Sequence, residues 1–477
     1  MHPCTLHKPI CWLLAALLVV GAFPTPAPAI TLGEEEELSR QIMRIIFKRF
    51  EIVEDPYISA YVTRVGRRIL AAQPEQPFRY HFYVIKDDSY NAFATPAGHI
   101  FVHTGLLQAM EREEELAGIL GHEIAHVYLR HISQKIDMAK KVGWAQLAGI
   151  AAGVLLGAAG GGAALGSAMA LGSQAAGATA QLAFSRENEI QADQTGLRLL
   201  TDSGYRAEGL VAILRKIRAK QAWGKQQIPV YMMTHPAIED RIVYTENWVE
   251  DNAVLLKSLA FVDPAEFDRI QTRLIAGMEN VGPELERLAA TVQADPDNVL
   301  VRHRYATALA RANRWDEAIA QLQQALSRRA FDGYLLRDLG KVYLLSGRLQ
   351  QALKALEGAR LTLPDDPDAL FFLGRAQQES GNLGEATILY QAVIQRMPEY
   401  RSAYYFLGQV QGRQGAVAEA HYNLGIYHLR GFDYKTAAAQ FRQSLRSNPD
   451  PARRERVEQL LKQMEVEIKE EKKALEG

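Results

Sequence analysis

Apolar side chains recur at helical spacing over most of this chain, and apolar and polar residues alternate only in short stretches. The helical spacing predicts helices over residues 34–49, 58–72 and 112–138. Alternation predicts strands over residues 80–85 and 99–103, the second after a turn at Pro96-Ala97-Gly98. The N-terminal part is therefore expected to be an α+β domain that is mostly helical.

Two apolar segments depart from this spacing. The first, residues 10–23, follows Lys8 and precedes Ala27-Pro28-Ala29, which is the pattern of a secretory signal peptide cleaved after Ala29. A retained N-terminal anchor is the alternative. Cys4 and Cys11 both lie within this leader, so the mature chain would contain no cysteine and no disulfide.

The second segment, residues 142–185, contains no charged residue and is rich in glycine and alanine. Small residues suit close packing inside a protein, and apolar length also suits peripheral contact with a membrane. Both interpretations stay open at this point.

The C-terminal part repeats with a period of 34 residues. Four sets of positions keep this register: Gly340, Gly374 and Gly408; Gly347, Gly381 and Gly415; Ala318, Ala352, Ala386 and Ala420; Pro364 and Pro398. Small residues where paired helices cross, with proline at the turn, predict tetratricopeptide repeats. Such a solenoid offers a concave groove for an extended peptide or a partner's surface, and a purely structural scaffold is the alternative.

The register shifts near the end of the chain. Ala437 lies 17 residues past Ala420, half a repeat, with Gly425 and Pro449 at the matching offsets. One helix over residues 417–429 is therefore expected to serve as the second helix of one repeat and the first helix of the next.

Composition excludes one class of function. The 477-residue chain has 54 basic and 55 acidic residues, a formal net charge of −1 and no block of Lys and Arg. Nothing in this balance favours binding to nucleic acid. The length predicts more than one domain.

The residues that carry chemistry lie inside the predicted helix over residues 112–138. His122 and His126 are four residues apart, so they share one helix face and can present two imidazoles to a zinc ion. Glu123 points about 100° away from His122. There it can take a proton from water, whose pKa zinc lowers toward 7. His131 is off the metal face and is expected at the surface.

A catalytic zinc ion needs a third protein ligand and leaves a fourth position for water. Residues 185–193 are expected to be helical, with Glu189 and Asp193 four residues apart. One of them can bind zinc while the other holds a ligand histidine by its far nitrogen. From spacing alone, Glu187 remains a competing ligand.

The order His122-Glu123-x-x-His126 and then Glu189-x-x-x-Asp193 resembles the zinc peptidases related to HtpX and to the CAAX-prenyl endopeptidase. With a signal peptide and a repeat tail, the chain resembles the family of beta-barrel assembly-enhancing proteases of Gram-negative envelopes. The resemblance extends to Asn91-Ala92-Phe93-Ala94 and Thr234-His235-Pro236. It implies Glu189 as the third zinc ligand, with Asp193 supporting the ligands from behind.

The resemblance implies two further parts of the site. A strand would pair with substrate as an added strand, through Gly98, His99, Ile100, Phe101 and Val102. His235 and Arg241 would lie near the zinc, where His235 either donates to the oxyanion or takes the fourth zinc position and keeps the enzyme latent. We prefer the latent role for His235, with Arg241 as the oxyanion stabiliser. A turn histidine without function is the alternative.

The sequence thus predicts a signal peptide (residues 1–29), a zincin-type peptidase domain (30–255), a helical connector (256–282) and an all-α tetratricopeptide-repeat domain (283–477). The resemblance implies a periplasmic endopeptidase with one Zn²⁺ per chain that cleaves misfolded or stalled outer-membrane proteins. Its repeats would recruit substrate or the outer-membrane assembly machinery. A chaperone-like adaptor with a latent zinc site is the alternative, and the intact Glu123 favours the enzyme.

Overall fold

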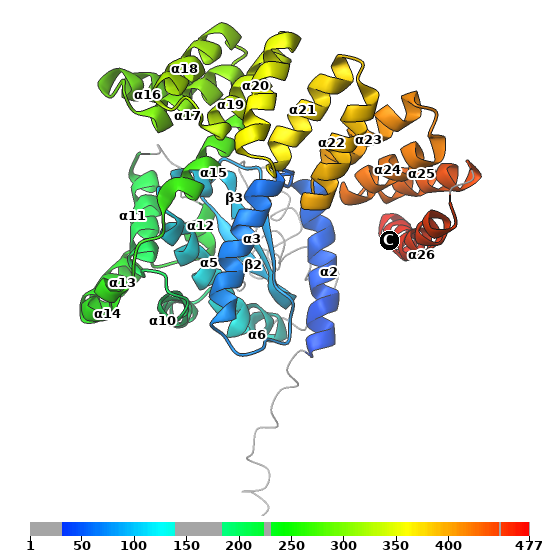
Figure 1. Cartoon of the computed structure of the whole chain (residues 1–477). Coiled ribbons are helices and arrows are strands. Elements are labelled where there is room, and N and C mark those ends of the chain that lie inside the picture. Colours follow the sequence, from blue (N-terminus) through cyan, green and yellow to red (C-terminus); the bar gives the residue numbers. More distant parts are fainter. Residues whose placement is uncertain (1–30, 139–183, 224–229, 448–449, 477) are drawn as a thin grey trace, which may run out of the picture. The chain divides into compact units, whose positions relative to one another are not determined.

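The computed structural model describes residues 31–138, 184–223, 230–447 and 450–476 (Figure 1). The predicted signal peptide and nearly all of the apolar segment over residues 142–185 lie outside the described residues. Within the described ranges, no helix is both long and apolar enough to cross a bilayer. The chain divides into two compact units, Met1–Ile52 with Val62–Val262, and Val53–Tyr61 with Asp263–Gly477.

The first unit combines a three-stranded sheet with helices. The strands are β1 (His81–Ile85), β2 (Ala92–Thr95) and β3 (His99–His103), in the order β1-β3-β2. The helices are α2 (Leu32–Arg49), α3 (Pro56–Ala71), α4 (Thr104–Ala109), α5 (Glu113–Tyr128), α6 (His131–Met138), α10 (Arg186–Asp202), α11 (Glu208–Trp223), α12 (Val230–Thr234), α13 (Ile238–Asp251) and α14 (Ala253–Ser258). The first residues of α3 group with the second unit.

The predicted strands and the first two predicted helices are confirmed, and two elements differ. Alternation does not reveal β2, because all four of its residues are buried and no exposed position marks an outer face. The helix predicted over residues 112–138 is two helices, α5 and α6. Arg130, between them, has φ of 54°, which a right-handed helix cannot accommodate.

The strand predicted over residues 99–103 is present, but the predicted pairing of Gly98, His99, Ile100, Phe101 and Val102 with substrate conflicts with its place in the sheet. β3, which contains the last four of them, is the central strand and pairs in parallel with β1 and antiparallel with β2. Gly98 lies in the 3₁₀ turn η1 (Pro96–Gly98) with φ of 87°. An added strand needs an open edge. The edge strand that packs against α5 is β2.

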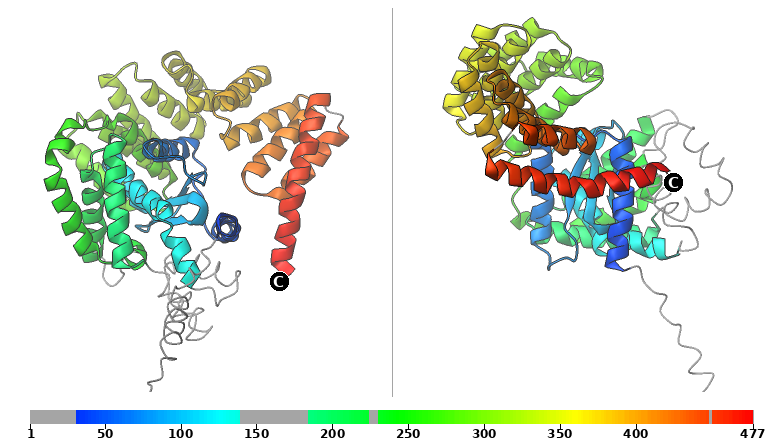
Figure 2. Two further views of the ribbon diagram at one scale, coloured as in Figure 1. Left: turned by 90° about the horizontal axis from the view of Figure 1, so that it is seen from below. Right: turned by 90° about the vertical axis from the view of Figure 1, so that its right-hand side faces the viewer.

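The second unit is a run of helices that follow one another in chain order (Figure 2). They are α15 (Pro264–Gly277), α16 (Gly282–Ala294), α17 (Val299–Arg311), α18 (Trp315–Arg328), α19 (Gly333–Leu345), α20 (Leu349–Thr362), α21 (Pro367–Glu379), α22 (Leu383–Arg396), α23 (Arg401–Arg413), α24 (Val417–Arg430), α25 (Tyr434–Arg446) and α26 (Pro451–Glu476). α15, within the predicted connector, groups with this unit.

The repeat positions have the roles that the sequence predicts. The register alanines are buried at the helix crossings, and Gly347, Gly381 and Gly415 take φ of 77°, 87° and 82° at the turns. Phe432, 17 residues past Gly415, has φ of 58° at the next turn. α24 packs against both α23 and α25, so the shared helix predicted over residues 417–429 is confirmed.

Candidate metal centre

Two helices of the first unit carry the motif residues and pack closely together. α5 is buried along almost its whole length and contacts α10 and α11. The approach to α10 leaves little room beside Gly196, because a Cβ there would lie 3.2 Å from the backbone nitrogen of His122, a tight contact for a side chain. This packing brings His122 and His126 of α5 beside Glu189 and Asp193 of α10.

Four ligand atoms converge between these helices. Nε2 of His122 lies 3.0 Å from Nε2 of His126 and 3.3 Å from Nδ1 of His235. The Glu189 carboxylate lies 3.5 Å from both of the α5 imidazoles and 3.2 Å from Nδ1 of His235. All four side chains are fully buried, and their ligand atoms lie within 4.8 Å of one another. His235 follows α12, so three separate parts of the chain meet here.

These separations fit a tetrahedral zinc ion. With zinc–nitrogen bonds of about 2.0–2.1 Å, the edges of a ligand tetrahedron are about 3.3 Å long. The observed separations are 3.0 to 3.5 Å. Burial opposes ionisation of Glu189, but His235 and Arg241 hold the pKa of its carboxyl well below the usual value. Glu189 therefore supplies the negative charge of the cluster, and the donor set is one that zinc prefers.

The far side of His122 contacts Asp193. Nδ1 of His122 lies 2.8 Å from Oδ1 of Asp193, which orients the ring so that Nε2 faces the other ligand atoms. Arg241 of α13 donates from Nε and Nη2 to this carboxylate at 2.8 and 2.7 Å. Its Nη1 lies 2.8 Å from Oε2 of Glu189. The buried guanidinium therefore holds both carboxylates of α10 in place.

The far side of His126 contacts a residue that the sequence placed at the surface. His131 is only 1% exposed, and its Nδ1 lies 3.0 Å from Nδ1 of His126. Its Nε2 lies 3.1 Å from Oε1 of Gln191. The surface prediction is wrong because the chain turns at Arg130 before α6 begins. With Nε2 of His126 facing the cluster, Nδ1–H of His126 donates to His131, and Nε2–H of His131 donates to Gln191.

Replacing His131 should therefore weaken zinc binding. His131→Ala leaves the Nδ1–H group of His126 without its acceptor, and we expect zinc affinity to fall by about 10–100-fold. Competition with a chromophoric chelator measures the affinity. His81→Ala, a change to an exposed histidine of β1, is the matched control. Equal zinc affinity of the two variants would show that His131 does not support the site.

Two aromatic rings also contact the cluster, and no motif in the sequence reveals them. Phe184 stacks on the ring of His126 with centroids 3.8 Å apart. Tyr231 of α12 stacks on the ring of His235 at 4.3 Å with an interplanar angle of 18°. The backbone N–H of His235 also donates to the carbonyl of Tyr231 at 2.8 Å. Tyr231 therefore fixes the ring that brings the fourth ligand atom to the cluster.

Glu123 adjoins the ligands without a hydrogen bond. Its carboxylate is fully buried, and neither oxygen has a hydrogen-bond partner in the part of the chain that the structure describes. Nε2 of His235 lies 3.6 Å from Oε1. Burial raises the pKa of Glu123 above its usual value, which suits a group that accepts a proton near neutral pH. Glu187, by contrast, is exposed and accepts a hydrogen bond from Gln191.

Comparison with known proteins identifies both parts of the chain. Residues 54–249 match the family described as Peptidase family M48. Residues 303–367 and 343–405 match families described as Tetratricopeptide repeat.

Three of the curated relatives, all of them peptidases, illustrate the similarity. The beta-barrel assembly-enhancing protease of Escherichia coli (strain K12) is 25% identical over 337 residues, 69% of this chain and 67% of that protein. The mitochondrial metalloendopeptidase OMA1 of Schizosaccharomyces pombe is 29% identical over 194 residues, 41% of this chain and 54% of that protein. The metalloprotease LoiP of Escherichia coli is 31% identical over 166 residues, 35% of this chain and 60% of that protein.

The chain therefore contains an M48 peptidase domain followed by tetratricopeptide repeats, and it is homologous to the beta-barrel assembly-enhancing proteases. It is a metalloendopeptidase. The predicted fold class, an α+β and mostly helical peptidase domain before an all-α repeat domain, is confirmed.

Proposed function

We propose that this metalloendopeptidase uses zinc, is secreted to the periplasm, and cleaves misfolded or stalled outer-membrane proteins. One observation carries the enzymatic part: His122, His126 and Glu189 converge beside Glu123, a buried carboxylate without a hydrogen-bond partner in the described ranges. The leader pattern that ends at Ala29 supports secretion. Similarity to the beta-barrel assembly-enhancing protease of Escherichia coli supports the substrate class.

His122, His126 and Glu189 would hold one zinc ion per chain, and the bound ion supplies a Lewis acid that lowers the pKa of water toward 7. Glu123 accepts the proton of the attacking water and passes it to the leaving amine. Asp193 keeps His122 in the orientation that ligation needs. Each buried polar side chain that α5 and α10 bring to the cluster therefore has a proposed role.

Arg241 has two candidate roles. Oxyanion stabilisation is the role expected from the sequence. Its contacts support a positioning role as well, because its guanidinium is bound to Asp193 and to the proposed ligand Glu189. To act on an oxyanion, one N–H group would have to turn from these carboxylates toward substrate. Arg241→Ala is therefore expected to lower both the turnover rate and zinc affinity if positioning dominates, and the rate alone if oxyanion stabilisation dominates.

The two acidic residues at the start of α10 provide a test of the ligand set. Glu189→Ala should lose zinc and activity together, because only a direct ligand contributes its bond to the metal. Glu187→Ala is the matched control, being two residues away on the same helix and exposed. It should keep both. Metal content after dialysis distinguishes the variants, and an empty site in Glu187→Ala would contradict the assignment.

The proposed activity is tested on the purified mature chain with an unfolded model substrate. Cleavage should stop when a chelator is added and return when zinc is restored. Cleavage that persists in excess chelator at zero bound zinc would exclude a zinc peptidase.

A second candidate function is a chaperone-like adaptor with a latent zinc site. The observation that favours it is His235, whose Nδ1 stands among the ligand atoms where a catalytic site would admit water. Such an adaptor would bind unfolded protein through its repeats and leave it intact. Binding without cleavage by the zinc-loaded wild type and by His235→Ala alike would support the adaptor. In either case the repeats would recruit substrate or the outer-membrane assembly machinery.

A further inference from the structure

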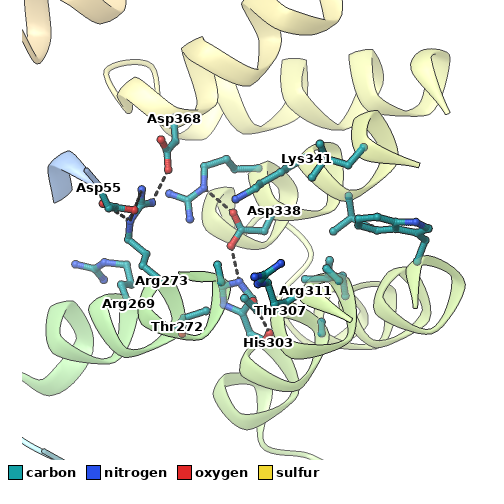
Figure 3. Close-up of a pocket in the computed structure, with 18 of the residues that line it drawn as sticks. Asp55, Arg269, Thr272, Arg273, His303, Thr307, Arg311, Asp338, Lys341 and Asp368 are labelled. Atoms are coloured by element: carbon teal, nitrogen blue, oxygen red, sulfur yellow. Dashed lines mark hydrogen bonds and ion pairs between the residues drawn. The ribbon is translucent and has the colours of Figure 1, made fainter. Parts of the chain in front are cut away.

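The second unit contains a cavity of about 240 Å³, and none of its lining residues belongs to the metal centre (Figure 3). Residues of α15, α17, α18 and α19 line it, together with Asp55 and Asp368. Asp55 belongs to the segment that groups with the repeats, so the whole cavity lies within one unit. The cavity is smaller than the ~300–1,000 Å³ typical of sites for whole drug-sized molecules. It therefore fits a side chain or two of a longer ligand.

The acidic groups of the cavity are already paired with cations of the same unit. Arg273 forms ion pairs with Asp55 and Asp368. Asp338 is held by His303 at 2.7 Å and by Arg337 at 2.8 Å (Figure 3). None of the three carboxylates is left to attract a cationic ligand.

Three cations of the same lining have no such partner. Arg269, Arg311 and Lys341 form no ion pair with any residue in the described ranges. Arg269 lies 4.8 Å from the ring of Tyr334, and Nε of Arg311 donates to a backbone carbonyl at 2.6 Å. The ammonium of Lys341 lies 5.0 Å from the ring centroid of Phe372. Lys341 and Arg269 interact electrostatically with Asp368 and Asp268 without forming ion pairs with them. The lining as a whole places five cations against three carboxylates, and it therefore favours an anionic ligand.

One part of the lining is apolar. Trp315 and Leu322 of α18 contribute to it, with Val342 and Leu345 of α19. Leu345 is 44% exposed, a large apolar side chain left open beside the cations. A bare inorganic anion would leave this surface in water. A ligand with an acidic group next to an apolar group covers both.

We propose that this cavity binds an acidic segment of an extended polypeptide, with an Asp or Glu side chain on Arg269, Arg311 and Lys341 and a neighbouring apolar side chain against Trp315. The size of the cavity and its mixed lining both match two adjacent side chains. The ligand is a polypeptide because that is what a metalloendopeptidase acts on. This inference rests on the proposed recruiting role of the repeats and names the chemistry that they recognise.

Peptide binding to the full mature chain tests the inference. The Glu123→Gln variant keeps the probe intact, and the probe is a labelled peptide with Leu-Glu pairs and an amidated C-terminus. Fluorescence anisotropy should detect binding that weakens with salt. Replacing Glu by Gln in the peptide, or changing Arg311→Met or Lys341→Met in the protein, should each weaken binding about tenfold, the effect of losing a charged hydrogen bond. Lys354→Met, an exposed lysine of α20, is the matched control and should bind as before.

Four outcomes would overturn the inference. The Gln peptide could bind as tightly as the Glu peptide, or Lys354→Met could weaken binding as much as Lys341→Met. A Gln peptide with a free C-terminus could bind through Arg311 and Lys341. The cavity would then recognise the C-terminal carboxylate of a polypeptide and not an acidic side chain. Inorganic phosphate could compete with the peptide at an equal concentration. The cavity would then be a site for a small inorganic anion. Turnover plays no part in this measurement, so its failure is distinguishable from failure of the proposed peptidase activity.

Discussion

Glu123→Gln is expected to abolish cleavage while zinc stays bound. The amide has nearly the shape of the carboxylate but cannot accept the proton of the attacking water, and loss of a general base typically costs about 10²–10⁴-fold in rate. Glu123 stands beside the ligand cluster and is not part of it, so zinc affinity should not change. The measurement is turnover of an unfolded substrate together with metal content of the same sample.

The matched control for this change is Glu187→Gln, the same substitution at an exposed carboxylate of the same unit. It should leave both turnover and metal content at the wild-type level. Turnover by Glu123→Gln within about tenfold of wild type, at full zinc occupancy, would remove Glu123 from the general-base role, because a general base is worth more than that. Loss of zinc in Glu123→Gln would instead make it a ligand.

The parts of this site that the sequence predicts are those fixed by local geometry. His122 and His126 share a face because a helix repeats every 3.6 residues, and this needs no knowledge of the fold. The 34-residue register is also local, since each hairpin must bury the same face against the next one. For the same reason the half-repeat shift at α24 can be read from Ala420 and Ala437 alone.

The parts that the sequence does not predict depend on distant residues or on a break in a helix. On a continuous helix, His131 would point about 140° away from His126, off the metal face. The left-handed residue Arg130 ends α5, and the ring returns to the cluster from α6. The strand order could not be predicted from the sequence either, because the central strand of the order β1-β3-β2 is the last of the three along the chain.

The cavity of the repeat unit was also beyond prediction from the sequence. Arg269, Arg311 and Lys341 are ordinary surface cations when read along the chain, spread over three helices. They share the absence of an ion pair within the described ranges, and this appears only when Asp55, Asp338 and Asp368 are seen to be paired with other cations. The 34-residue periodicity predicts the helical repeats, but it does not predict which of their cations lack an ion pair.

Replacement of His235 is the second change for which we expect a large effect on the rate of proteolysis, because its two candidate roles predict opposite changes. In this structure its Nδ1 lies 3.3 Å from Nε2 of His122 and 3.2 Å from Oε1 of Glu189, at the fourth corner of the ligand set. Its Nε2 faces Glu123 at 3.6 Å. The imidazole therefore takes up the space in which water would have to meet both the metal ligands and the base.

We therefore expect His235→Ala to raise basal proteolysis several-fold, including self-cleavage, because removing the ring opens that position to water. If His235 instead donated to the oxyanion, its loss would slow turnover by about 10²–10³-fold. Initial rates of wild type, His235→Ala and Arg241→Ala should be compared on one unfolded substrate at matched zinc occupancy. Thermal unfolding of each variant shows whether the new cavity destabilises the domain. A fall in the rate of His235→Ala, with zinc and folding retained, would exclude latency, since a ring that blocks water cannot also be needed for turnover.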